Sequence, residues 1–237
     1  MKSLLDELRT YQDGDPSGLG GRIAELPKQC WRAWEAAQRF VLPKEYTRVN
    51  KIVLLGMGGS AIGGDLLAGL TALETAPPIT VVRDYMLPSY VDSLTLVIAS
   101  SYSGNTEETL STFELALGRG ARVVAITGGG QLARKCRDSD TPIFHVDYQG
   151  EPRSALGYSF IVPMAILCNL GLISPQGIAL NEALALLGHQ GALYGLTIPI
   201  EQNPAKALAQ NQHIIGLGPG VALDVGDIHH SNDCQPI

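Results

Sequence analysis

Two short turns rich in small residues are the parts of this sequence best suited to bind a ligand. The first, residues 56–64, has the sequence GMGGSAIGG, and the second, residues 100–108, has the sequence SSYSGNTEE. Each follows a buried apolar run typical of a strand and leads into a segment with helix-like composition. The first N–H groups of a helix lack partners within the helix and lie at the positive end of its dipole, so such turns bind anions. Two of them in succession predict a phosphate held between neighbouring helix starts.

The first turn also fits a dinucleotide-binding fingerprint. Gly56, Gly58 and Ala61 match Gly-x-Gly-x-x-Ala, and Asp84 is the candidate ribose ligand. However, Asp84 lies later than the roughly 20-residue spacing that this fingerprint has. A dinucleotide also has no need of a second, hydroxyl-rich turn, so a nicotinamide or flavin site is the weaker interpretation.

The hydroxyl groups of the second turn favour a phosphate monoester. Ser101, Ser103 and Thr106 can converge on three oxygens of one phosphate, as the binding of a sugar phosphate requires. The alternative is that these residues only cap a helix, because Ser and Thr are good N-caps. Capping explains one such turn as well as binding does, but it explains two consecutive turns less well.

The composition indicates a soluble globular protein whose substrate is recognised by local geometry. The chain has 237 residues, of which 45% are hydrophobic and 17% charged, and its net charge is −6. Its Lys and Arg residues are scattered, which argues against nucleic acid as a partner. The four cysteines are far apart, so neither a metal site nor a disulfide framework is indicated. No segment resembles a signal peptide or a membrane span, and a cytoplasmic location is expected.

Strand-like and helix-like segments alternate from residue 51 onward. The predicted strands are 51–55, 79–82, 94–99, 121–126 and 142–146, and the helices between them are 60–71, 104–117 and 129–136. Further helices are predicted near 1–18, 23–40, 154–170, 181–187 and 203–210, with one more strand at 213–218. This pattern predicts a three-layer, doubly wound α/β fold around a parallel sheet. Both turns fall at the carboxyl ends of strands, where such sheets bind ligands.

Five motifs together resemble one known family. They are GMGGSAIGGD from residue 56, RDYxLP from 83, SYSGNTEET from 101, EPRxAxGY from 151 and NPAKxLA from 203. They resemble the sugar isomerase (SIS) fold and, within it, the bifunctional phosphoglucose/phosphomannose isomerases, with a similarity that extends to about residue 216. The resemblance implies two flavodoxin-like SIS subdomains, phosphate binding by the first, and a homodimer. It divides this chain into an N-terminal helical segment (1–48), a phosphosugar-binding SIS domain (49–195), and a linker with an incomplete second subdomain (196–237).

The resemblance also assigns binding residues. The phosphate cradle that it implies consists of Gly58, Gly59, Ser60, Ser101, Ser103 and Thr106. Arg153 is expected to reach the substrate, since one Arg supplies charge-assisted hydrogen bonds without making the surface basic. A surface ion pair is the alternative role for Arg153.

The acid–base residues are less clearly marked. In the family, a Glu in Gln-x-Asn-Glu-Asn moves the proton and a His in Pro-Glu-x-x-His-Asn opens the sugar ring, without a metal or organic cofactor. Neither motif is intact here, and the candidates are Asp233, whose carboxylate is one methylene shorter, and His230. A displacement of about 1 Å can cost roughly a hundredfold in rate, so the shorter acid matters. The alternative is that the tail has no catalytic role. Other titratable residues considered for the site are Glu107, Glu108, His145, His189, Lys206 and His213.

Three functions are therefore considered. The first is an isomerase that interconverts glucose 6-phosphate or mannose 6-phosphate with fructose 6-phosphate through a cis-enediol. The second is a sugar-phosphate-binding SIS module or shortened homologue without turnover. The third, supported only by the dinucleotide fingerprint, is an oxidoreductase.

Overall fold

The computed structural model describes residues 3–211, which form parts of two compact units. One unit comprises residues 19–192, and the other combines residues 1–18 with residues 193–237. The division into three segments at residues 48 and 195 remains a prediction. The strand expected at 213–218 lies outside the described residues.

A five-stranded parallel sheet forms the centre of the larger unit. Its strands are β1 (Lys51–Leu55), β2 (Ile79–Val82), β3 (Thr95–Ser101), β4 (Arg122–Thr127) and β5 (Ile143–His145). They are arranged in the order β2-β1-β3-β4-β5, and every neighbouring pair is parallel. The chain moves outward from β1 to β2 and then returns to place β3 on the other side of β1. This reversal is the topological switch point at which doubly wound sheets bind ligands.

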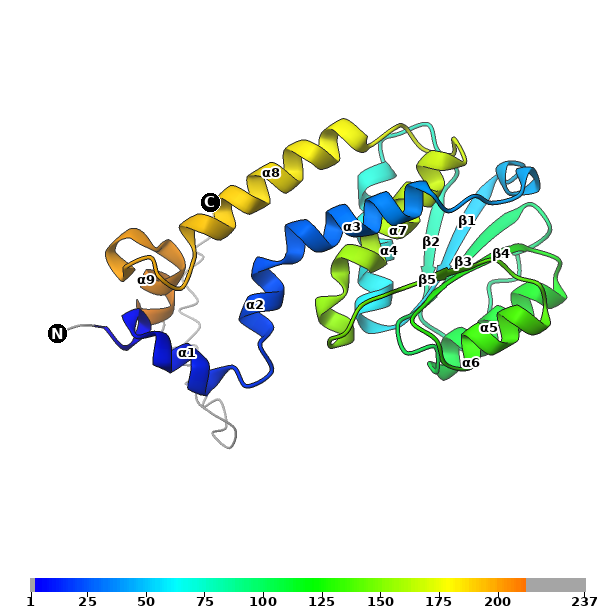
Figure 1. Cartoon of the computed structure of the whole chain (residues 1–237). Helices are drawn as coiled ribbons and strands as arrows, with labels where there is room; N and C mark the ends of the chain where they lie inside the picture. The colour runs from blue at the N-terminus through cyan, green and yellow to red at the C-terminus, as the bar shows by residue number, and fades with distance from the viewer. Residues whose placement is uncertain (1–2, 212–237) are drawn as a thin grey trace, which may run out of the picture. The chain divides into compact units, whose positions relative to one another are not determined.

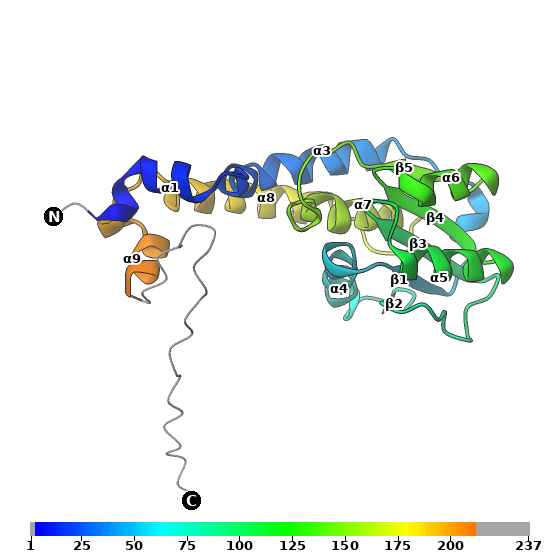
Figure 2. The ribbon, with the colours of Figure 1, turned by 90° about the horizontal axis from the view of Figure 1, so that it is seen from below.

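Helices cover both faces of the sheet. Those of the larger unit are α2 (Leu19–Ala24), α3 (Leu26–Gln38), α4 (Gly58–Thr71), α5 (Glu107–Gly118), α6 (Gly130–Asp138), α7 (Leu156–Asn169) and α8 (Gly177–Leu193). Short 3-10 helices also occur: η2 (Lys44–Thr47) and η3 (Pro152–Ser154) in this unit, and η4 (Ile200–Gln202) in the other. Figure 1 shows α5 and α6 on one side of the sheet and α3, α4 and α7 on the other. In both Figure 1 and Figure 2, α3 runs along α7, with which it packs.

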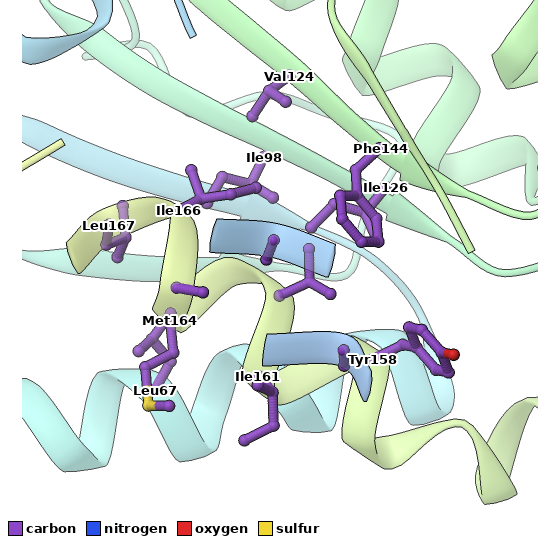
Figure 3. Packing of buried hydrophobic residues seen from close by; sticks show 14 of the residues in the cluster. Leu67, Ile98, Val124, Ile126, Phe144, Tyr158, Ile161, Met164, Ile166 and Leu167 are labelled. Atoms are coloured by element: carbon purple, nitrogen blue, oxygen red, sulfur yellow. The ribbon is translucent and has the colours of Figure 1, made fainter. Parts of the chain in front are cut away.

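Alternate residues along the strands belong to two separate hydrophobic clusters. Ile52 and Ile98 belong to the cluster with α3, α4 and α7, whereas Val53 and Val97 belong to the cluster with α5 and α6. Successive side chains of a strand point to opposite faces, so a sheet covered on both faces needs apolar residues at every position. Figure 3 shows strand side chains such as Val124 packed against those of α7.

The predicted doubly wound α/β fold is thus confirmed, and the main difference concerns α8. The sequence predicted a helix near 181–187, but α8 spans Gly177–Leu193, and Leu180 is its only buried residue. The predicted helix ends before Gly188 and Gly191, and Gly is a poor helix former. Instead, α8 continues through both glycines, and His189 lies on the helix rather than in a linker.

The smaller unit joins the two ends of the described chain. Its elements are η1 (Leu4–Asp6), α1 (Leu8–Gly14), η4 and α9 (Pro204–Asn211). Lys206 is buried, and its Nζ donates to Asp6 Oδ1 at 3.1 Å and to Leu196 O at 2.8 Å. Asp6 Oδ1 also accepts the Ile200 N–H at 3.0 Å. These contacts give Lys206 a structural role within this unit.

Candidate phosphate-binding site

The two predicted turns begin side by side at the carboxyl edge of the sheet. Strands β1 and β3 are paired with Leu55 opposite Ala99, so the two segments that follow these strands leave the sheet at the same level. A Cβ atom on Gly56 would lie only 3.1 Å from Ser100 O. The predicted proximity of the two turns is therefore present in the structure.

The first turn leads directly into α4 and leaves the start of this helix open. Met57 is the N-cap and provides no side-chain cap, and Gly58 and Gly59 are the first helical residues. Ser60, one residue further, is buried and lines a small cavity together with Ser100 of the second turn. Backbone N–H groups of the first turn of a helix that lack such a cap are available to an anion.

The hydroxyl groups of the second turn bind one another rather than cap α5. Ser101 Oγ and Thr106 Oγ1 are 2.9 Å apart, and Ser101 Oγ accepts the Gly104 N–H at 3.1 Å. Ser103 Oγ accepts the Asn105 N–H at 3.2 Å. Thr106 is the N-cap of α5, yet its side chain makes no cap hydrogen bond. The capping interpretation therefore fails at this helix, and its first N–H groups stay free of a side-chain cap.

Contacts with the start of α6 fix the shape of the second turn. Gly104 has φ +68°, and a Cβ there would lie 1.8 Å from Gly129 O, so only glycine fits. Gly104 O accepts the Leu132 N–H at 2.8 Å, and Asn105 Oδ1 accepts the Gln131 N–H at 3.0 Å. The turn that carries the three hydroxyl groups is thus held in place without a ligand.

Arg153 lies beside the first turn. It is part of η3, and a Cβ built on Gly59 would be 2.9 Å from Pro152 O and 3.4 Å from the Arg153 Cα. Its side chain is exposed, and within residues 3–211 it forms no ion pair. The surface ion pair considered as its alternative role is therefore not formed among these residues.

The other candidates have separate positions. Asp84 Oδ1 accepts the Met86 N–H at 3.1 Å, so it stabilises its own turn. Glu107, in the first turn of α5, accepts a hydrogen bond from Tyr85 Oη at 3.2 Å. Desolvation and the nearby carboxylates of Glu108 and Glu107 raise the pKa of Tyr85 above its ordinary value.

The remaining titratable candidates do not join the cradle. Glu108 is half-buried in the first turn of α5, and His145 is exposed at the end of β5. His189 is exposed on α8, and Lys206 is engaged with Asp6. His213, His230 and Asp233 lie outside the described residues. The structure therefore places the first turn beside both the second turn and Arg153, and the predicted catalytic residues lie outside the described residues.

Within residues 3–211, no cluster of three or more His, Cys, Asp or Glu side chains is placed to bind a metal ion. None of the helices there has the length and apolar character needed to cross a bilayer.

Comparison with known proteins assigns the family. The pattern described as "SIS domain" matches residues 45–166, about half of the chain and nearly the whole sheet with both turns. The chain belongs to the SIS domain family. Its SIS domain therefore contains every residue of the predicted cradle and Arg153.

Curated relatives share the similarity, and one of them extends it beyond the length of the SIS domain. One named bifunctional phosphoglucose/phosphomannose isomerase, from Caldicellulosiruptor bescii, is 41% identical over 186 residues, which cover 78% of this chain and 55% of the relative. Another of the same name, from Aquifex aeolicus, is 42% identical over 118 residues, which cover 49% of this chain and 37% of the relative. The chain thus spans about half or less of the length of these relatives.

Solved structures share the fold. A hypothetical protein from Thermus thermophilus superposes with a TM-score of 0.62 at 22% identity, over 87% of this chain and 51% of that one. Tagatose-6-phosphate ketose/aldose isomerase from Escherichia coli gives a TM-score of 0.51 at 20% identity, over 74% of this chain and 55% of that one. At these identities the likeness concerns the SIS fold alone.

Sequence reasoning did not anticipate the role of Tyr102 between the cradle serines. Its hydroxyl donates to Tyr148 O at 2.7 Å and accepts the Gly150 N–H at 3.3 Å, which links the second turn to the segment before η3. The position of Tyr102 inside the motif was visible, but nothing in the sequence pairs it with residue 148. This link bears on how Arg153 is held.

Proposed function

We propose that this SIS protein binds a phosphorylated hexose and interconverts glucose 6-phosphate or mannose 6-phosphate with fructose 6-phosphate. One observation supports the proposal more than the others: two turns leave the sheet side by side, one of them rich in hydroxyl groups, and each leads into a helix whose N-cap residue provides no side-chain cap. The names of the relatives that are about 41% identical support the choice of substrate.

Each cradle residue has a proposed role. The backbone N–H groups of Gly58 and Gly59 and the Ser60 side chain bind the phosphate from the α4 side. Ser101, Ser103 and Thr106 donate to it from the α5 side. Arg153, next to Gly59, contacts the sugar part of the ligand.

The proposed chemistry is a proton transfer within the sugar. After the ring opens, a base removes the proton from C2 of the aldose while O1 gains a proton, which gives a cis-enediol. The base then returns its proton to C1 while O2 loses its proton, which forms the ketose. Donors that stabilise the enediolate lower the barrier. We propose Asp233 as the base and His230 as the acid that opens the ring, with no metal or organic cofactor. A homodimer in the cytoplasm completes the proposal, and light scattering on a sizing column tests the dimer.

Turnover and binding are tested separately. Purified full chain with fructose 6-phosphate should yield glucose 6-phosphate, which a coupled dehydrogenase assay detects. Asp233→Asn and His230→Asn should lose this turnover and keep the affinity for glucose 6-phosphate, measured by titration calorimetry. Binding without any turnover would instead identify a sugar-phosphate-binding module, because the whole proposed cradle lies in the SIS domain. Absence of binding would overturn both proposals.

A further inference from the structure

The segment that carries Arg153 is not fixed in place by burial of the residues around Arg153. We call residues 151–157 the strap; it contains η3 and the first two residues of α7. Its backbone touches the first turn at Gly59, as described above. Pro152 and Arg153 are exposed, so apolar burial does not fix the position of Arg153. Other contacts must therefore hold this part of the strap.

A buried amide from a distant helix binds the strap at two points. Gln29 of α3 is only 6% exposed. Its Nε2 donates to Ser154 O at 2.9 Å, and its Oε1 accepts the Gly157 N–H at 2.7 Å. Gly157 is the second residue of α7, a helix whose N-cap, Ala155, provides no side-chain cap. Gln29 therefore caps α7 from outside and, through the same amide, fixes the residue that follows Arg153.

Two further contacts hold the strap from other sides. Arg22 of α2 forms an ion pair with Glu151. Tyr148 Oη donates to Ser154 Oγ at 2.9 Å, and the Tyr148 carbonyl accepts the hydroxyl of Tyr102 in the second turn. The strap is thus connected to both cradle turns and to the helices α2 and α3. Of the side chains that hold the strap, Gln29 is the buried one, and both polar atoms of its amide are hydrogen-bonded to the strap.

We propose that Gln29 is a positioning residue for substrate binding: it holds the strap so that Arg153 stays beside the phosphate cradle. This inference rests on the proposed function. It differs from a general stabilising role because it acts through Arg153, and losing Gln29 should matter only while Arg153 is present. If Gln29 only stabilised the fold, its loss would lower stability and ligand affinity to the same extent whichever residue stands at position 153.

A double-mutant cycle with ligand binding as the readout separates these roles. The variants are Gln29→Met, Arg153→Gln and the two combined, with Gln38→Met, an exposed position on the same helix, as the matched control. Gln29→Met removes both hydrogen bonds at similar volume and should raise the Kd for glucose 6-phosphate about tenfold. In the Arg153→Gln background, the same change should have no further effect. Inorganic phosphate, which probes the cradle alone, should bind Gln29→Met and wild type equally.

Each outcome supports or overturns the inference. If wild type binds glucose 6-phosphate and Gln29→Met binds it equally well, or if the two changes add, the positioning role is wrong and the proposed function stands. If wild type binds neither ligand, the proposed function fails and the inference fails with it. Thermal melting checks that each variant folds. Should Gln29→Met not fold, Arg22→Met loosens the strap from the solvent-facing side and must show the same dependence on Arg153.

Discussion

Ser103 offers the cleanest single-residue test of the cradle. Its side chain is exposed, and its hydroxyl accepts one local hydrogen bond, from the Asn105 N–H, so Ser103→Ala should leave the fold intact. Losing one donor to a charged phosphate should cost about 1–2 kcal/mol, or roughly 5- to 30-fold in Kd for glucose 6-phosphate. Titration calorimetry measures the change, with Ser89→Ala, another exposed serine, as the control. An unchanged Kd would place the phosphate elsewhere.

Two buried thiols make the protein sensitive to alkali. Burial raises the pKa of Cys30 and of Cys136 from the ordinary value of 9.0 to about 11. The folded state therefore favours the neutral thiols. Stability should be independent of these groups below pH 9 and should fall as the pH rises from 9 to 11. Urea unfolding across this range measures the effect, and replacing both cysteines with alanine should remove this part of the pH dependence.

At the scale of elements, the close contact between α4 and α7 depends on one glycine. A Cβ on Gly63 would lie 2.1 Å from Ser159 O, and that neighbour is backbone. Gly63→Ala should therefore separate the two helices and lower the free energy of unfolding by about 3 kcal/mol or more. Gly69→Ala, in the same helix with no atom within 4 Å of the new Cβ, should raise it by roughly 0.5–1 kcal/mol. Equal effects of the two changes in urea unfolding would contradict the close contact.

The elements also show what the sequence could and could not predict. Strand 51–55 was predicted with the bounds that the structure has, because a strand buried on both faces is a nearly continuous apolar run. The proximity of the two cradle turns followed from the topology of parallel sheets. The contact of Gln29 with Gly157 could not be predicted, since the two residues are 128 positions apart and neither belongs to a local motif that pairs them. The length of α8 was underestimated, and the helix continues through Gly188 and Gly191 although glycine has a low helix propensity.

At the scale of the whole molecule, the two units should lose structure separately. Asp6→Ala removes the partner of a buried Lys206 and should destabilise the unit of residues 3–18 and 193–211 by on the order of 3 kcal/mol. Hydrogen exchange of those residues should then rise, while exchange in the sheet of residues 51–145 stays unchanged. Asp13→Ala is the control, because Asp13 forms an exposed ion pair with Arg9. A rise in both units would show that they unfold together.

The chemical makeup of the cradle decides how binding should respond to acid. Glycine amides and the hydroxyl groups of serine and threonine do not ionise in the physiological range, and the guanidinium of Arg153 stays protonated there. A cradle built from these groups adds no titration step of its own. The affinity should instead follow the ligand, whose phosphate takes up its second proton near pH 6. In calorimetric titrations between pH 5 and 8, the affinity should therefore fall below about pH 6. Ser103→Ala should lower the affinity by the same factor at every pH and leave the pH midpoint of the change where it is.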